Sequence, residues 1–208
     1  MSEGRTLVID SASEACSVAL VEDGRVVDFR HEIIGRGHAE RLVPLIAELA
    51  DGGRAASIAV GCGPGSFAGV RIGVAAARGL ALGWSVPVRG FATPSLVAAA
   101  AAAEIAAAGG GLLVMEGGHG QWFVQPFSAD LSPRDTVRSL LPEEAVLAGD
   151  AFVFGNRAEA FVARRGSGNA LAILPDTRAF SRLSAAALFD NPSPIYGRAP
   201  DAKPMAIA

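Results

Sequence analysis

The sequence predicts an α/β fold in which short strands and helices alternate. Three observations carry this prediction. Apolar runs near the N-terminus are separated by turn residues, among them Asp23-Gly24, a strong signal for a two-residue hairpin turn. From residue 37 to about residue 90, leucine-rich helical spacing alternates with short apolar strands. After residue 110, a strand, a small-residue loop and a returning strand resemble the first hairpin.

The N-terminal part begins with three strands, and the hairpin turn makes them a three-stranded antiparallel meander. Their expected ranges are Thr6–Ser11, Cys16–Glu22 and Arg25–Ile33. A helix is predicted next, from about Gly37 to Asp51, because apolar residues repeat at helical spacing. These residues are Leu42, Leu45, Ile46 and Leu49. Pro44 lies inside this pattern, so we expect a bend or a later start.

The first part then continues with a buried strand, Ser57–Cys62, which we expect to run parallel to a neighbour. A glycine-rich turn leads into a second helix, and a short strand, Val86–Arg89, follows it. The order is β-β-β-α-β-α-β. We therefore expect one domain over residues 1–92 and another over residues 93–208.

The second part is predicted to start with a helix, Pro94–Ala108, followed by strands Leu112–Glu116 and Gln121–Ser128. The stretch TLVIDSASEACSVAL is weakly similar to GLLVMEGGHGQWFVQPF, which suggests an internal duplication. Beyond residue 128 we expect three helical segments around one strand. Their ranges are Glu143–Leu147, Phe152–Phe154 for the strand, Asn156–Arg164 and Ser181–Phe189. The proline-rich tail, NPSPIYGRAPDAKP, is expected to be extended.

Composition limits the function classes. The chain has 208 residues, a net charge of −3 and no dense cluster of basic residues, which disfavours a stand-alone nucleic-acid-binding protein. The N-terminus, MSEGRTLVID, has no signal-peptide pattern, and the apolar segment Pro94–Ala108 is too short to span a bilayer. Cys16 and Cys62 both fall in predicted strands, as small core residues in a reducing compartment. We expect a cytoplasmic protein without membrane contact.

Residues 62–83, CGPGSFAGVRIGVAAARGLALG, follow a strand and open a helix, an arrangement that often holds phosphate. A P-loop would need a lysine at a fixed spacing after its first glycine, and this stretch has none. Gly63, Gly65 and Ala68 match the dinucleotide fingerprint literally, but the next strand offers Arg89 where an acid should hold the ribose. Neither class of phosphate site is therefore favoured.

The same stretch is better explained as a structural turn and cap. A nucleophile elbow around Ser66 would need glycines where Pro64 and Ala68 stand. Pro64-Gly65 instead predicts a tight turn, and Ser66 predicts a helix N-cap. The residues assigned to the turn, the cap and the start of a close-packing stripe are Gly63, Pro64, Gly65, Ser66 and Gly69.

Two faces of the second helix are distinguished by their composition. Small residues recur three or four positions apart, among them Gly69, Gly73, Gly79 and Gly83, and we expect close packing along this stripe. A second face is mixed in character and is either solvated or in contact with a partner. It consists of Arg71, Ala75, Arg78 and Leu82.

Other candidate sites are weak. No two of the three histidines stand at a usual metal-ligand spacing. We expect His38 to be a surface or capping residue and His119 to be exposed in a glycine loop. Asp10 ends the first strand, where many sugar kinases and actin-like ATPases place an acid near Mg²⁺. The loop that follows it, Ser11–Glu14, lacks the glycine that such loops use to contact phosphate.

Four stretches together resemble the TsaB family, also called YeaZ, and they occur in that family's order over nearly the whole chain. They are IDSASEACSVALVEDG, HAERLVPLI, GPGSFAGVRIGVAAARGLALG and PIYGRAPDAKP. The glycine-helix motif is the most specific of them, and residues from about 128 to 190 match poorly.

The resemblance implies an actin/Hsp70/sugar-kinase-like (ribonuclease H-like) fold with two lobes, of which the second is reduced. It also implies a cytoplasmic, non-catalytic scaffold subunit. Such a subunit binds and activates TsaD, a paralogue that transfers a threonylcarbamoyl group to the adenosine next to the anticodon of tRNA. TsaE joins the larger complex, and the subunit forms a homodimer when alone. Nucleotide and metal are expected on TsaD and not on this chain, which would meet tRNA only through the complex.

The sequence agrees with one implication and departs from the family pattern in two places. TsaD-like proteins carry an H-x-x-x-H metal pair where this chain has Phe91–Ala98, a segment without histidine. The threonine usual after the phenylalanine of the glycine loop is Ala68, and the usual Asp-Ala-Arg of the second hairpin is Glu116-Gly117-Gly118. We therefore transfer no role of that arginine to this chain.

Two classes of function remain at this stage. In the first, the chain is an interaction subunit whose interface with TsaD, or with itself, is built from the first two helices. The predicted interface residues are Leu42, Leu45, Ile46, Leu49, Arg71, Ala75, Arg78 and Leu82. In the second, it is an enzyme, an M22-type glycoprotease or a small ATPase of the same fold. The missing histidine pair and the loop poor in phosphate-binding features argue against the enzyme.

Overall fold

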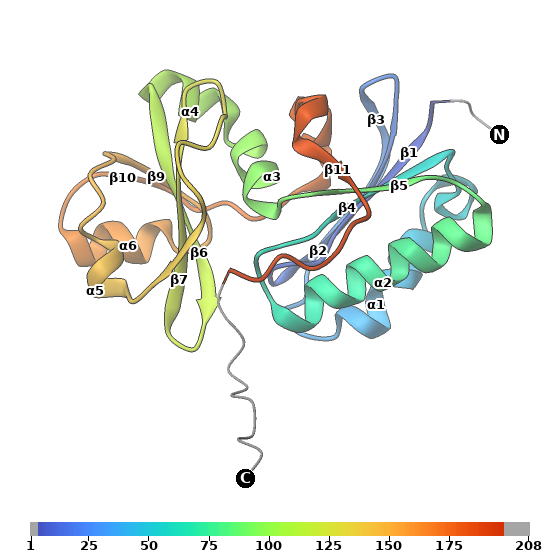
Figure 1. The fold of residues 1–208 in the computed structure, drawn as a ribbon, viewed down its shortest axis with the longest axis horizontal. Helices are drawn as coiled ribbons and strands as arrows, with labels where there is room; N and C mark the ends of the chain where they lie inside the picture. Colours follow the sequence, from blue (N-terminus) through green and yellow to red (C-terminus); the bar gives the residue numbers. More distant parts are fainter. Residues whose placement is uncertain (1–3, 198–208) are drawn as a thin grey trace, which may run out of the picture.

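The computed structural model describes residues 4–197 and confirms the α/β fold. Two mixed β-sheets stand side by side, and helices cover their outer faces and fill the space between them (Figure 1). The first sheet has six strands in the order β11-β5-β4-β1-β2-β3, and the second has five in the order β10-β9-β6-β7-β8.

The first sheet begins with the predicted meander. Its strands are β1 (Thr6–Asp10), β2 (Ala15–Glu22), β3 (Arg25–Ile33), β4 (Ser57–Gly61), β5 (Val88–Phe91) and β11 (Leu188–Asp190). β1 pairs antiparallel with β2 and parallel with β4, so the predicted parallel strand is confirmed. β11 pairs antiparallel with β5, which brings the end of the described chain back to the first sheet.

One face of the first sheet is covered by the helices α1 (His38–Ala47) and α2 (Phe67–Trp84), with the short 3-10 helix η1 (Ala50–Gly53) after α1. Apolar side chains of both helices and of the sheet form one buried cluster. Pro44 lies within α1, and the helix ends at Ala47 instead of continuing to Asp51. The 3-10 helix η1 occupies the last part of the range that was predicted as one helix, and its residues Asp51 and Gly52 have left-handed conformations.

The second sheet repeats the architecture of the first. Its strands are β6 (Gly110–Gly118), β7 (Gln121–Ser128), β8 (Arg138–Leu140), β9 (Phe152–Phe154) and β10 (Asn169–Leu171). Its outer helices are α5 (Pro142–Ala145) and α6 (Ala158–Arg165). The strand order β8-β7-β6-β9-β10 matches β3-β2-β1-β4-β5 position by position. The suspected internal duplication is therefore confirmed at the level of topology, with shorter helices in the second copy.

The helix α3 (Thr93–Ala100) lies between the two sheets and is buried on nearly all sides. Leu96 and Ala99 pack against the first sheet, whereas Val97 and Ala98 pack against the second. This double contact explains a helix that is apolar all round. The 3-10 helix η2 (Thr177–Arg182) fills the rest of this layer, and η3 (Ala185–Ala187) follows it.

Several predictions on elements were wrong. The single helix Pro94–Ala108 is two helices, α3 and α4 (Ala102–Ala108), which break at Ala101 so that α4 can pack beside β6. The helix expected over Ser181–Phe189 is replaced by η2, η3 and β11, because pairing with β5 and contact between Phe189 and Gly90 override local preference. The strands β8 and β10 were not expected.

The part of the chain from residue 4 to residue 197 includes no helix with both the length and the apolar character needed to cross a bilayer. Of the proline-rich tail, residues 191–197 have no regular secondary structure, and the rest lies outside the described residues.

Candidate functional site

The glycine-rich turn is held against the end of β1 by a buried polar cluster. Thr93 Oγ1 donates to Asp10 Oδ2 at 2.9 Å and accepts from the amide of Gly63 at 3.2 Å. The amide of Ala12 donates to Asp10 Oδ1 at 3.0 Å. Burial raises the pKa of Asp10 to about 6, although the hydrogen bonds from Ala12 and Thr93 oppose this rise. Asp10 thus fixes the turn and the start of α3 in place.

The glycines of the turn allow the loop between β1 and β2 to approach closely. A Cβ atom at Gly65 would overlap the carbonyl oxygen of Ala12, and one at Gly69 would overlap the carbonyl oxygen of Ser11. Ser66 caps α2, because its Oγ accepts from the amide of Gly69 at 3.3 Å. The geometry of the turn is therefore explained by packing between chain segments.

The small-residue stripe is only half packed. Gly69 and Gly73 face the loop after β1, as expected. Among residues 4–197, a Cβ atom at Gly79 or at Gly83 would meet no heavy atom within 4 Å beyond the backbone of α2 itself, and both residues are exposed. The expectation of close packing along the whole stripe is wrong for this second pair, which lies on the outer surface of α2.

The predicted interface residues divide into two groups. Those on and just after α1 are core residues, with exposed fractions of 3% or less, and they cannot contribute to a surface of this chain. They are Leu42, Leu45, Ile46 and Leu49. Their helical spacing marks the side of α1 that packs on the first sheet. A surface built from α1 must instead use its outward residues, such as Ala39, Val43 and Ala47.

The residues predicted on α2 are all exposed. Arg71, Ala75, Arg78 and Leu82, which we name the α2 stripe, lie along the side of the helix that faces away from the sheet. Leu82 is 83% exposed. Gly79 and Gly83 lie beside the stripe, so a partner helix could approach the backbone of α2 closely. α1 and α2 pack side by side, so α1 lies next to the helix that carries the stripe.

An exposed aromatic group extends the α2 stripe at its N-terminal end. Phe67 is 60% exposed and Tyr196 is 51% exposed, with ring centroids 5.8 Å apart. The guanidinium carbon of Arg71 lies 3.7 Å from the Phe67 ring centroid, and Arg71 Nη2 donates to Tyr196 Oη at 3.0 Å. Sequence reasoning missed this group, because Tyr196 follows Arg71 by 125 positions and no local pattern joins them.

The cleft between the sheets is lined by loops from both halves. Asn156 Nδ2 donates to Glu14 Oε2 at 2.8 Å, and Asn156 Oδ1 accepts from the amide of Glu116 at 2.9 Å. Glu116 also accepts from Arg157 Nε at 2.6 Å. The Glu14 carboxylate lies in the loop between β1 and β2, and the Glu116 carboxylate lies near the end of β6, the strand of the second copy that matches β1.

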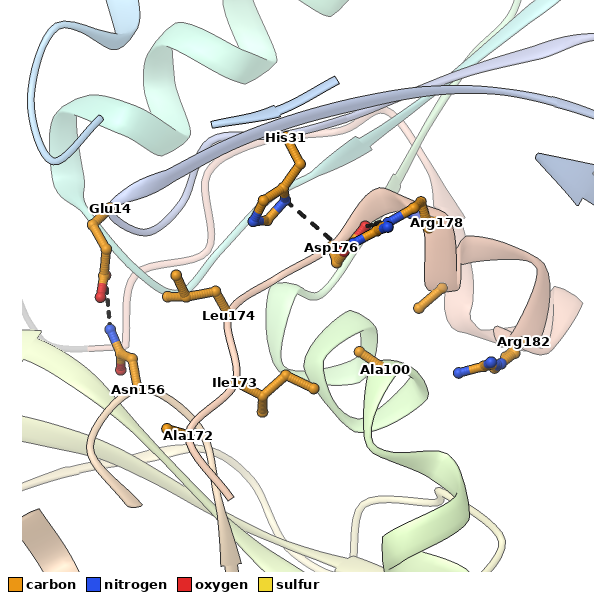
Figure 2. A pocket seen from close by; sticks show the side chains of 11 residues that line it. Glu14, His31, Ala100, Asn156, Ala172, Ile173, Leu174, Asp176, Arg178 and Arg182 are labelled. Atoms are coloured by element: carbon orange, nitrogen blue, oxygen red, sulfur yellow. Dashed lines mark hydrogen bonds and ion pairs between the residues drawn. The ribbon is translucent and has the colours of Figure 1, made fainter. Parts of the chain in front are cut away.

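A pocket of about 680 Å³ opens beside this cleft (Figure 2). Its apolar wall includes Ile173 and Leu174, and its polar lining comes from Glu14, His31, Asn156, Asp176, Arg178 and Arg182. No sequence pattern joins these residues, which come from distant elements.

The remaining predicted positions have ordinary structural environments. Cys16 and Cys62 are buried and unbonded, as expected, and burial raises the pKa of their thiols to about 12 and about 11. His119 is exposed as expected. His38 is buried, with Nε2 3.4 Å from the carbonyl oxygen of Ala15, so its expected surface position is wrong. Within residues 4–197, no cluster of three or more His, Cys, Asp or Glu residues could hold a metal ion.

Comparison with known proteins places the chain in a family. The model of the family described as "TsaD: tRNA N6-adenosine threonylcarbamoyltransferase" matches residues 30–148, more than half of the chain. The tRNA threonylcarbamoyladenosine biosynthesis protein TsaB of Escherichia coli is 46% identical over 94 residues, which are 43% of this chain and 40% of that protein. TsaB of Haemophilus influenzae is 44% identical over 87 residues, 39% of this chain and 36% of the relative. These matches span about two fifths of the curated relatives.

Solved structures extend the likeness to nearly the whole chain. YeaZ from Pseudomonas aeruginosa has a TM-score of 0.77 and 27% sequence identity, and the match covers 93% of this chain and all of that one. The ethanolamine utilization protein EutJ from Carboxydothermus hydrogenoformans, at 13% identity and a TM-score of 0.50, shares the fold alone. The family model, the TsaB relatives and the YeaZ structure agree, and the chain belongs to the TsaB (YeaZ) group of the TsaD family.

Proposed function

We propose that this chain is a non-catalytic interaction subunit in the biosynthesis of threonylcarbamoyladenosine in tRNA, and that it acts by binding TsaD. The names of its TsaB relatives supply the process. The observation that carries the interaction role is the exposed α2 stripe with its aromatic and arginine group. Aromatic and arginine side chains dominate the binding energy of protein interfaces. In this group three such side chains, Phe67, Arg71 and Tyr196, already contact one another.

The α2 stripe also has the shape that helix packing requires. Ala75 and Gly79 stand between larger exposed residues, so a partner helix could insert its side chains between Arg71 and Leu82. TsaD would bind here in the complex, and a second copy of this chain would bind here when TsaD is absent. TsaE would join the larger complex without a site of its own on this stripe.

The cleft supports a role without nucleotide chemistry in this chain. In kinase-like folds, loops from the two halves bind the phosphates of ATP. Here the loop after β1 carries Glu14, whose carboxylate would repel phosphate oxygens at close range, whereas the carboxylate of Glu116, near the end of β6, is already paired with Arg157. Asp10 is sealed beneath the glycine turn by Thr93 and lies out of reach of a metal ion in the cleft.

A charge placed in the middle of the α2 stripe tests the proposal. Ala75→Glu should leave the chain folded, because Ala75 is exposed, but it would place a large charged side chain where the partner helix must approach closely. We expect affinity for TsaD to fall at least about tenfold in isothermal titration calorimetry, and any homodimer to dissociate in size-exclusion chromatography with light scattering. Modification of tRNA in a reconstituted assay should fall with it.

Ala160→Glu is the matched control, because Ala160 is an exposed alanine on α6, an outer helix of the other sheet. It should leave affinity and modification unchanged. Equal binding of TsaD by wild type and by Ala75→Glu would refute the placement of the interface. Full-rate tRNA modification without this chain would refute the proposed function itself.

A further inference from the structure

The strand β3 forms one edge of the first sheet, and among residues 4–197 no strand pairs with its outer side. With nine residues it is longer than the usual strand of about five or six. Two apolar side chains on it, Val27 and Phe29, are 48% and 40% exposed. A long edge of this kind offers its outward N–H and C=O groups to a strand of another chain.

The backbone of Phe29, in the middle of this edge, is already bonded to the side chains on either side of it. Its register opposite β2 directs its N–H and C=O groups to the open side of β3. The amide of Phe29 donates to Asp28 Oδ1 at 2.8 Å, and Arg30 Nη1 donates to the carbonyl oxygen of Phe29 at 2.7 Å. Arg30 Nη1 also donates to Asp28 Oδ1 at 2.7 Å. A strand added at this position would have to break these bonds.

The side chains of Asp28 and Arg30 are themselves fixed to the segment after α1. Asp28 Oδ2 accepts from the amide of Ala50 at 2.8 Å. Arg30 Nη2 donates to the carbonyl oxygen of Glu48 at 2.6 Å. Because these bonds already restrict the rotamers of both side chains, little further conformational entropy is lost when they bond Phe29. We name Asp28 and Arg30 the edge clamp.

The sequence of β3 is suited to pairing with β3 of a second copy. If two such strands met antiparallel with Phe29 opposite Phe29, the two residues would exchange both of their backbone hydrogen bonds. Asp28 of each copy would then face Arg30 of the other, so that opposite charges lie across from each other. The edge is therefore self-complementary, and the same two charged residues that would support this pairing instead bond the backbone that it needs.

We propose that the edge clamp prevents two copies of this chain from joining their first sheets through β3. It engages the N–H and the C=O at the centre of the edge, which such a pairing requires. The inference does not depend on the proposed function, because β3 and the α2 stripe are different surfaces of the first half of the chain.

The double variant Asp28→Ala/Arg30→Ala tests the proposal, because it removes both side chains that bond Phe29. It is made in the Ala75→Glu background, so that the α2 stripe does not contribute to association. In size-exclusion chromatography with light scattering, we expect about twice the mass of the Ala75→Glu protein at the same concentration. Arg30→Ala alone keeps the bond between Asp28 and Ala50, and it should show the same gain of mass at higher concentration.

Glu48→Ala in the same background is the matched control. It removes a carboxylate beside Arg30 but leaves the bonds to Phe29 in place, so the mass should not change. Val27→Lys, added to the double variant, should restore the smaller mass, because a lysine on an exposed edge disfavours strand addition. Loss of structure alone would not be reversed by this change.

Circular dichroism verifies that each variant is folded, and Arg30→Ala replaces the double variant if the latter is not. An unchanged mass in the folded clamp variant would overturn the proposal. An equal gain of mass in Glu48→Ala, or a gain that Val27→Lys does not reverse, would overturn it as well.

Discussion

The carboxyl group of Asp10 is buried, and its pKa is raised from the ordinary 3.8 to about 6. A carboxyl whose folded-state pKa lies above its unfolded value adds stability below pH 4 and loses that contribution as pH rises through about 6. For Asp10 this difference amounts to about 3 kcal/mol. Asp10→Asn cannot ionise, so its stability should change less between pH 4 and pH 8. Urea unfolding of both proteins at several pH values measures this difference.

Asp28 offers a control of opposite sign at the residue scale. Desolvation alone would raise its pKa, but hydrogen bonds from Ala50, Arg30 and Phe29 outweigh it and lower the pKa. Its contribution is therefore present at neutral pH and is lost as pH falls through the folded-state pKa. Asp28→Asn should weaken the protein most at neutral pH.

A stability difference between Asp10→Asn and wild type that stays constant from pH 4 to pH 8 would contradict the assignment for Asp10.

Within one element, α2, two glycines should respond oppositely to the same substitution. Gly69→Ala would force a methyl group into the carbonyl oxygen of Ser11, so we expect a loss of about 1–3 kcal/mol in the free energy of unfolding. Gly79→Ala meets no neighbouring atom and raises helix propensity, so we expect a gain of about 0.5–1 kcal/mol. Urea titrations at low protein concentration measure both. A loss in both variants would show that Gly79 is packed.

The elements that the sequence predicts well are those with a local signal. The hairpin turn Asp23-Gly24 and the alternation around it place β3 at the expected bounds. The three-residue strands β8, β10 and β11 carry no such pattern, since they exist only through pairing with strands far away in sequence. The apolar, alanine-rich stretch after residue 93 gives no local sign of the break at Ala101, which depends on packing between two sheets.

The same difference between local signals and distant contacts explains which residues of the candidate site could be predicted from the sequence. An amphipathic repeat identifies one apolar face, and in α1 that face belongs to the core, so Leu42 and Leu45 were wrongly assigned to a partner. In α2 the mixed face was the one left exposed, and it remains the proposed interface. The position of Tyr196 and the pocket around His31 depend on contacts between segments that are far apart in the sequence. Local patterns in one sequence do not show which distant segments meet, so neither feature could be predicted.

At the scale of the whole molecule, two copies of one topology face each other across α3, and their helices have diverged. α1 and α2 have 10 and 18 residues, whereas α5 and α6 have 4 and 8. The long helices of the first copy supply the α2 stripe. The second copy is joined to the first by few polar contacts, among them the hydrogen bond from Asn156 to Glu14. This bond should therefore help set how tightly the two halves close.

Asn156→Asp tests that connection, because it replaces the donor to Glu14 with a second carboxylate. We expect a loss of about 1–3 kcal/mol in the free energy of unfolding, together with faster hydrogen exchange in the loop Ser11–Glu14. Arg157→Ala is the matched control, since Arg157 is exposed and pairs with Glu116 within the second copy, and it should cost less than about 1 kcal/mol. If the arginine variant loses as much stability as Asn156→Asp, or if exchange in the first loop stays unchanged, the bond does not hold the halves together. Agreement with both expectations would mean that the cleft loops, which in kinase-like folds bind phosphate, here join the two halves directly.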